Sequence, residues 1–192
     1  MSVLSVALSK EHTFSKTPVR SITLVKDLGV EGDVHNGLTD QHRPRLHIKP
    51  APVNLRQVHL MQNEILEDFG VKPADIGENI TTTGIDLLAL GRGTRIHFLP
   101  ASVVTGGDGY TDGAGGPQPH AIIRITGLRH PCPMIEKFRG GLQEKFIVRD
   151  QERKIVERKA GVMGVVEVGG TVEPGMRLKM EKPSEFEPLA CV

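Results

Sequence analysis

The stretch AIIRITGLRHPCPMI, residues 121–135, joins a strand, a rigid turn and the start of a helix. Ala121–Thr126 is rich in Ile, which predicts a strand because branched side chains favour extended backbone. Pro133 is suited to the first turn of a helix, where its missing N–H group is not needed. A strand that ends in Arg-His-Pro-Cys-Pro would present the thiol of Cys132 at the mouth of a barrel.

The rest of the chain is divided into short segments. Its 22 Gly and 13 Pro separate pieces rich in Val, Ile and Thr, which is typical of strands joined by turns. One stretch has clear helical spacing, from Met61 to Phe69, with Gly70 at its end. We therefore predict a mainly β barrel or sandwich with one or two short helices in a single domain. The further candidate strands are Ser2–Leu8, Ser21–Val25, Asn79–Thr83, Thr94–Leu99, Ser102–Thr105, Gly164–Glu167 and Arg177–Met180.

Composition excludes several classes of protein. The 192 residues carry 24 Lys+Arg and 23 Asp+Glu, a formal net charge of +1, so we expect neither a nucleic-acid partner nor a membrane partner. No segment approaches the roughly 18 apolar residues of a membrane span, and the N-terminus does not resemble a signal peptide. We expect a cytoplasmic protein. The tail over 181–192 has two prolines, three glutamates and no periodicity, which predicts a flexible end.

Two long segments are predicted loops. Asn36–Pro52 carries His42 and His47, but the histidine spacing matches no zinc-binding pattern. Gly106–Pro119 has six glycines without the spacing of a phosphate-binding loop, so we interpret it as a flexible connection or lid.

Cys132 has neighbours that affect both its chemistry and its geometry. Arg129 and His130 place one fixed and one titratable positive charge within three residues, which favours the reactive thiolate. Pro131 and Pro133 hold the cysteine in extended backbone. The residues alone leave a second interpretation open, in which Cys132 is one more small buried side chain.

Five segments of the chain stand in a recognisable order. They are GVEGDVHNG (29–37), LRQVHLMQNEIL (55–66), IGENITTTGIDLLALGRGTRI (76–96), ITGLRHPCPMI (125–135) and KAGVMGVVEVGGTVEPGMRL (159–178). Over roughly residues 15–180 the chain resembles the MOSC domain family, named for the molybdenum cofactor sulfurase C-terminal domain. The resemblance implies a β-barrel-like domain over residues 1–180 with one functional cysteine, which maps to Cys132. That cysteine would either carry sulfur as a persulfide or ligate the molybdenum of a pterin cofactor.

The resemblance also directs attention to charged residues around the cysteine. A molybdenum-pterin cofactor carries a phosphate and a soft metal–dithiolene centre, so its site should combine cations with a thiolate. Arg129 is the candidate for binding an anion near Cys132. Lys16 and Arg20 are candidates for the cofactor phosphate, although each also fits an ordinary surface charge.

Two polar turns complete the candidate site. Gly77-Glu78-Asn79 would place a carboxylate and an amide at a tight turn, where Asn79 can bind a pterin edge and Glu78 is a candidate catalytic residue. A turn that caps itself through Asn79 fits the same residues. His35 would donate a proton or orient an oxo ligand, and it also fits a turn residue.

Three functions follow from these expectations. The first is a molybdenum-dependent oxidoreductase that reduces small N-hydroxylated or N-oxide compounds, with Cys132 as the Mo ligand. The chain lacks the cysteines of an iron–sulfur cluster and a dinucleotide fingerprint, so a separate electron-donor protein would be needed. The second is a sulfur carrier or sulfur transferase, loaded by a cysteine desulfurase with a persulfide on Cys132.

The third function is a non-catalytic β-barrel binding protein. Enzymatic activity therefore stays open at this stage, and the cation candidates lead us to favour cofactor binding. Some members of the family are fused to a pyridoxal-phosphate-dependent desulfurase domain. Because 192 residues leave no room for such a domain, we expect no pyridoxal phosphate site in this chain.

Overall fold

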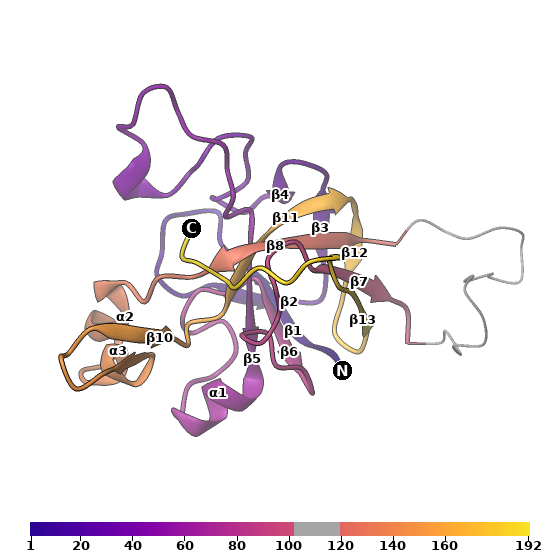
Figure 1. Cartoon of the computed structure of the whole chain (residues 1–192). Helices are drawn as coiled ribbons and strands as arrows, with labels where there is room; N and C mark the ends of the chain where they lie inside the picture. The colour runs from indigo at the N-terminus through magenta and orange to yellow at the C-terminus, as the bar shows by residue number, and fades with distance from the viewer. Residues whose placement is uncertain (102–119) are drawn as a thin grey trace, which may run out of the picture.

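Seven strands close into a β-barrel (Figure 1). The computed structural model describes residues 1–101 and 120–192. Within these residues β13 pairs with both β7 and β1, which closes the ring, and every neighbouring pair is antiparallel except β5 and β6. In order around the barrel, the strands are β13 (Arg177–Glu181), β7 (Arg95–Leu99), β8 (Ile122–Leu128), β11 (Val162–Val168), β5 (Val58–Gln62), β6 (Ile80–Thr83) and β1 (Ser2–Leu8).

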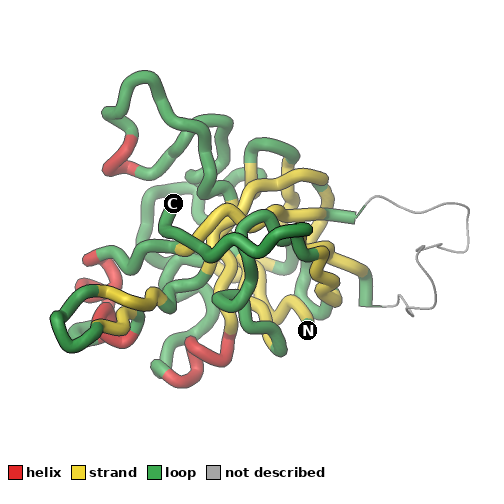
Figure 2. The backbone as a smooth tube through the Cα atoms, viewed as in Figure 1, coloured by secondary structure: helices red, strands yellow, loops and turns green. Residues whose placement is uncertain are grey.

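Smaller elements surround the barrel, and the helices lie at its periphery (Figure 2). β2 (Thr17–Val19) extends the sheet beyond β1, and β12 (Gly170–Val172), β3 (Ile22–Val25) and β4 (Gly29–Val30) form a second small sheet. β9 (Ile147–Arg149) and β10 (Ile155–Arg158) form a hairpin. The helical segments are η1 (Arg43–Arg45), α1 (Asn63–Asp68), α2 (Pro133–Phe138) and α3 (Leu142–Lys145). In the part of the chain that the structure describes, no helix is long and apolar enough to cross a membrane.

Two hydrophobic clusters support the fold. The first fills the barrel with side chains such as Phe98, Ile123 and Val166, each at most 1% exposed. The second lies beneath α2 and α3 around Phe146, and Cys132 packs against it. Full burial of one large apolar side chain contributes about 1.5–3 kcal/mol. The second cluster therefore anchors the turn and helix that carry the cysteine.

The fold class predicted from the sequence is confirmed. The predicted strand Ser2–Leu8 coincides with β1, and the helix expected at Pro133 is α2. The candidate strand Ser102–Thr105 and the loop Gly106–Pro119 lie outside the described residues. The order of the strands around the barrel, including the parallel β5–β6 pair, was not part of the prediction.

The start of the predicted helix at Met61 is wrong. Met61 belongs to β5, and α1 begins two residues later, at Asn63. Residues 58–61 are buried continuously, because Val58 and Leu60 pack into the barrel core while Met61 packs into the second cluster. A strand buried on both faces lacks the alternation that separates strand from helix in sequence.

The tail, expected to be flexible, lies against the barrel in the structure. Cys191 forms an isolated parallel bridge with Leu128 of β8. The Leu128 N–H donates to Ala190 O at 2.8 Å, and the Arg92 N–H donates to Glu187 O at the same distance. A Cβ added at Gly127 would collide with the Ala190 carbonyl oxygen. Close backbone packing thus gives this segment defined partners.

Candidate functional site

A cavity of about 480 Å³ opens at one end of the barrel. Its walls come from the segment after β1, the loop between β4 and β5, the turn before β6 and the turn after β8. Five histidines, four Lys or Arg side chains and one cysteine line it: His12, His35, His42, His59, His130, Lys16, Arg43, Arg56, Arg129 and Cys132. The cavity is therefore rich in cations and hydrogen-bond donors around a single thiol.

Cys132 sits where β8 passes into α2. It is the N-cap residue of α2, with φ −84° and ψ 160°, and Pro133 follows it as the first helical residue. The Gln143 side chain donates to the Pro131 carbonyl at 3.0 Å and so ties α3 to the turn. The backbone of Cys132 is extended because Pro133 disfavours helical backbone in the residue before it. The turn expected from the sequence thus presents a partly buried thiol to the cavity.

Arg129 lies between Cys132 and Glu78. Its N–H donates to Gly161 O at 3.0 Å, which fixes the backbone from which the side chain extends. Burial lowers the pKa of Arg129, and the charge of Cys132, the charge of Glu78 and a hydrogen bond to the Cys132 side chain oppose that shift. Nη1 is shielded from solvent and has no hydrogen-bond partner among the described residues. Such a donor is costly to bury unless a ligand satisfies it.

Asp33 organises another part of the cavity wall. Its carboxylate accepts hydrogen bonds from the Ser9 N–H at 3.2 Å, from the His35 N–H at 3.0 Å and from Asn79 Nδ2 at 3.0 Å. It also forms an ion pair with Lys16 and contacts His35 Nδ1 at 3.2 Å. The Asp33 side chain is 1% exposed. Three residues predicted from separate motifs, Lys16, His35 and Asn79, therefore meet at one carboxylate.

This arrangement determines the charges on that wall. Burial acts to raise the pKa of Asp33, but the hydrogen bonds from His35 and the charge of Lys16 outweigh burial and hold the pKa well below its ordinary value. Burial lowers the pKa of Lys16, and the Asp33 charge opposes the shift. Because Asp33 occupies Nδ1 of His35, Nε2 is the ring nitrogen that His35 can offer to the cavity.

Glu78 and Asn79 have different roles in the turn before β6. Glu78 is fully buried and does not line the cavity; its Oε1 accepts from the Ala74 N–H at 2.6 Å and from Thr81 Oγ1 at 3.1 Å. Burial raises the pKa of Glu78, and the backbone hydrogen bonds and the Arg129 charge oppose the shift. Asn79 lines the cavity, but its amide is engaged by Ala7 O, Asp33 and the His59 N–H.

Burial lowers the pKa of four cavity histidines, His12, His42, His59 and His130. His59 donates from Nε2 to Ala160 O at 2.7 Å, and burial with the nearby Arg129 charge lowers its pKa well below the ordinary value. Burial, followed by the charge of Arg56, lowers the pKa of His42 to about 4. Neutral rings can donate and accept hydrogen bonds without adding charge. The fixed positive charge of the cavity therefore comes from Lys and Arg.

The structure does not bring Arg20 to this site. Arg20 is exposed beyond β2 and does not line the cavity. Sequence reasoning had assigned no role to Asp33, Arg56, His42 or His59. The signal for Asp33 was present, since it lies two residues before His35 in the segment GDVHNG. Arg56 and His59 lie in the quoted segment LRQVHLMQNEIL, but no candidate site residue stands next to them, and long-range packing brings them to the cavity.

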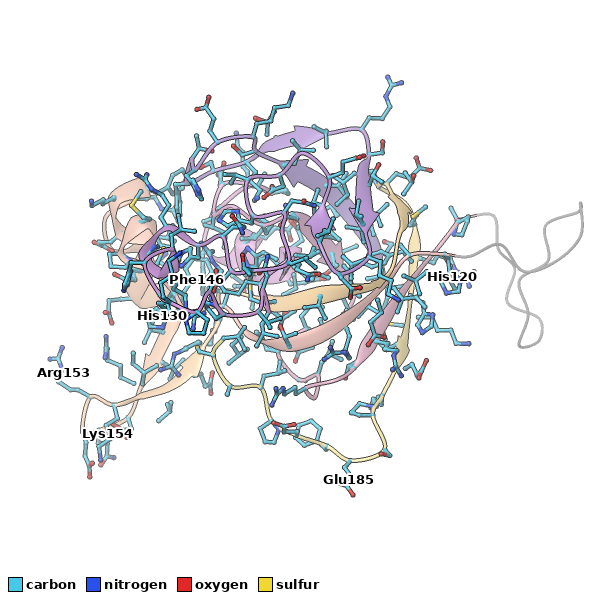
Figure 3. The ribbon with its side chains drawn as sticks, turned by 90° about the horizontal axis from the view of Figure 1, so that it is seen from above. His120, His130, Phe146, Arg153, Lys154 and Glu185 are labelled. Carbon is cyan, nitrogen blue, oxygen red and sulfur yellow. The ribbon has the colours of Figure 1, made fainter. Side chains whose placement is uncertain are left out.

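A pair of histidines, His97 and His120, lies away from the cavity. Figure 3 shows His130 near one end of the barrel and His120 near the other. His97 Nδ1 and His120 Nε2 are 2.7 Å apart, and His97 Nε2 contacts Glu181 at 3.2 Å. Within residues 1–101 and 120–192, no group of three His, Cys, Asp or Glu side chains is placed to hold a metal ion.

The comparisons with known proteins place the chain by its fold. Its sequence matches no protein-family model and no curated protein. The structure is similar to that of the YuaD protein from Bacillus subtilis, with TM-score 0.67 and 20% identity over 95% of this chain and 96% of that chain. It is also similar to YiiM from Escherichia coli, with TM-score 0.55 and 18% identity over 97% and 73% of the respective chains.

A third similar structure is YiiM from Geobacillus stearothermophilus, with TM-score 0.57 and 16% identity over 93% of this chain and 74% of that chain. At these identities the likeness concerns the fold alone. It supports the MOSC-type fold expected from the sequence motifs.

Proposed function

We propose that this chain is a MOSC-family protein that binds a molybdenum-pterin cofactor in the cationic cavity, with Cys132 as the protein ligand of the metal. We further propose that it reduces small N-hydroxylated or N-oxide compounds with electrons from a separate donor protein. Reduction of one N-hydroxyl group to N–H consumes two electrons and two protons and releases one water molecule.

The observation that carries the proposal is the unpartnered Arg129 Nη1 beside Cys132. A buried guanidinium with a free donor is suited to an anionic ligand, and a thiolate is suited to a soft metal. Cys132 is one of the groups that act on the pKa of Arg129, and both side chains line the same cavity. The described residues thus fit a ligand that combines negative charge, polar edges and a metal centre that brings its own sulfur ligands.

Each side chain has a distinct task in this proposal. When bound, the cofactor would supply two-electron oxo-transfer chemistry that the side chains cannot perform. Cys132 would hold the metal, and Arg129 would stabilise negative charge next to it. Arg56 and Lys16 would bind anionic parts of the ligand, although Asp33 already neutralises Lys16.

Proton transfer falls to His35 in this scheme. Its Nδ1 contacts Asp33, which orients the ring and leaves Nε2 for a proton exchanged with substrate. Glu78 does not line the cavity and contacts Arg129 electrostatically. We therefore assign Glu78 to positioning Arg129 rather than to proton transfer.

The decisive experiment measures molybdenum and pterin in the protein purified from a host that makes the cofactor. We expect stoichiometric Mo in the native protein and its loss in Cys132→Ser. Cys191→Ser is the matched control and should retain Mo, because Cys191 lies in the tail and does not line the cavity.

The same purification tests the sulfur-carrier alternative. Cys132 lines the cavity and is only partly buried, and an accessible thiol suits persulfide exchange as well. Protein without Mo whose Cys132 gains about 32 Da, the mass of one sulfur atom in thiol–sulfur exchange, would establish the carrier and overturn the oxidoreductase. Protein with neither Mo nor added sulfur would favour the third function, a non-catalytic binding protein.

A further inference from the structure

The segment from Leu38 to Val53 forms a loop that stands away from the barrel (Figure 1). Its base is closed by an antiparallel bridge between Thr39 and Val53. The Asp40 N–H donates to Pro52 O at 2.9 Å, and the Asn54 N–H donates to Leu38 O at the same distance. We call residues 38–53 the mouth loop, because its base is fixed to the barrel and its inner side borders the cavity.

The mouth loop has two different sides. His42, Arg43 and Pro44 line the cavity. Elsewhere on the loop large apolar side chains are exposed, and none of the three residues of η1 is buried. Single exposed apolar residues are ordinary, but several within one short loop mark an interaction surface. The exposed fractions are 64% for Leu38, 48% for Leu46, 37% for Ile48 and 72% for Val53.

The charge of the mouth loop is one-sided. Residues 38–53 contain three cations, Arg43, Arg45 and Lys49, and one acidic residue, Asp40. Arg45 is paired with Asp40 at 3.0 Å, whereas Arg43 and Lys49 are exposed. Apolar side chains interspersed with cations complement a partner surface that presents apolar residues within an acidic rim.

We propose that the mouth loop is the docking surface for an acidic redox protein that delivers electrons to the cavity. This inference rests on the proposed reductase function. A partner bound to the loop would lie beside the cavity, because the same loop supplies part of the cavity wall. The partner would be oxidised by two electrons per substrate molecule, while solvent supplies the two protons that the reduction consumes.

The test is direct binding of the full chain to an acidic ferredoxin, with cytochrome c as a basic redox protein for comparison. We expect saturable binding to ferredoxin only, and at least tenfold weaker affinity when the salt concentration rises from about 0.05 M to about 0.3 M. The double variant L46S/I48S and the single variant K49E should each weaken binding about tenfold, since rim charges and central apolar contacts both contribute.

Two matched variants control for nonspecific effects. V156S removes an exposed apolar side chain of β10, and K182E reverses an exposed charge in the tail. Both should bind ferredoxin as the native protein does. Circular dichroism of all four variants should be unchanged, because each substituted side chain lies on the surface.

Three outcomes would overturn the docking proposal. The first is equal binding of ferredoxin and cytochrome c. The second is ferredoxin binding whose affinity is unchanged in L46S/I48S. The third is an effect of L46S/I48S that is seen only in self-association or in binding to phosphatidylserine vesicles. Binding is measured without regard to metal content. Failure of the docking surface is therefore distinct from failure of the reductase function, which the Mo analysis of Cys132→Ser decides.

Discussion

Asn79 Nδ2 donates a 3.0 Å hydrogen bond to Asp33 Oδ2, across 46 positions of the sequence. The same carboxylate oxygen accepts from Lys16 and from the Ser9 N–H. Asp33 thus joins the segment after β1, the loop after β4 and the turn before β6 at one point. The shape and the charge of one cavity wall depend on this single buried carboxylate.

Asp33→Asn should destabilise the protein by about 3 kcal/mol or more at neutral pH, because it leaves Lys16 buried without its counter-ion. The folded state lowers the pKa of Asp33 below the ordinary value of 3.8. Its stabilising effect is therefore complete above that pH and is lost as the pH falls below it. Urea unfolding near pH 7 and near pH 3 should show that the difference in free energy of unfolding between the native protein and the variant is smaller in acid.

The control for Asp33 is Asp68→Asn at the exposed end of α1. We expect this surface change to stay within about 0.5 kcal/mol. Equal losses in the two variants at neutral pH would contradict the central role of Asp33.

Arg129→Met should slow alkylation of Cys132 by the anionic reagent iodoacetate several-fold near pH 7, because it removes the cation beside Cys132 that attracts the carboxylate of the reagent. The alkylation rate of Arg129→Lys should lie between the rates of the native protein and Arg129→Met, since lysine retains the charge but lacks the planar guanidinium group. The measurement is the rate of mass increase in a Cys191→Ser background. Arg20→Met, which alters an exposed cation outside the cavity, should leave the rate unchanged; equal slowing there would refute the proximity argument.

Gly77→Ala should lower the melting temperature more than Gly175→Ala. Both glycines have left-handed backbone, with φ of +86° and +90°, so each substitution costs about 1–3 kcal/mol in strain. Only at Gly77 would the new Cβ also collide with the carbonyl oxygen of Phe14, a residue of the cavity wall. Scanning calorimetry of the pair separates strain from collision, and equal shifts would show that the segment around Phe14 moves freely.

Glu78→Gln should change how stability depends on pH. Because the folded state raises the pKa of Glu78 above the ordinary value of 4.5, ionisation of Glu78 destabilises the native protein as the pH rises through that value toward the raised pKa. Glutamine removes this loss. The stability of the variant relative to the native protein should therefore increase as the pH rises above 4.5 and level off above the raised pKa of Glu78.

Urea unfolding at several pH values measures that difference. The comparison between the two proteins is needed because histidines with lowered pKa values change the free energy of unfolding with pH in the opposite direction. The pKa of His59 is lowered in the folded state, so stability rises as the pH increases toward its ordinary value of 6.5 and is lost in acid. A constant difference between Glu78→Gln and the native protein would contradict the raised pKa.

The sequence by itself determined the local features. The strand Ser2–Leu8 and the proline-bounded turn around Cys132 follow from side-chain alternation and from the fixed backbone of proline. These effects act over a few residues, so they can be predicted from the sequence without knowledge of the fold. The order of the family-like motifs also indicated which fold they build.

Only the tertiary structure decided how the candidate residues meet. It joined Lys16, His35 and Asn79 through Asp33, placed Arg129 between Cys132 and Glu78, and left Arg20 outside the cavity. Such contacts connect segments far apart in the sequence, and burial then sets the charge of each group. A local sequence pattern predicts neither which distant strands pair nor which side chains are shielded from water. These two properties determine the chemistry of the cavity.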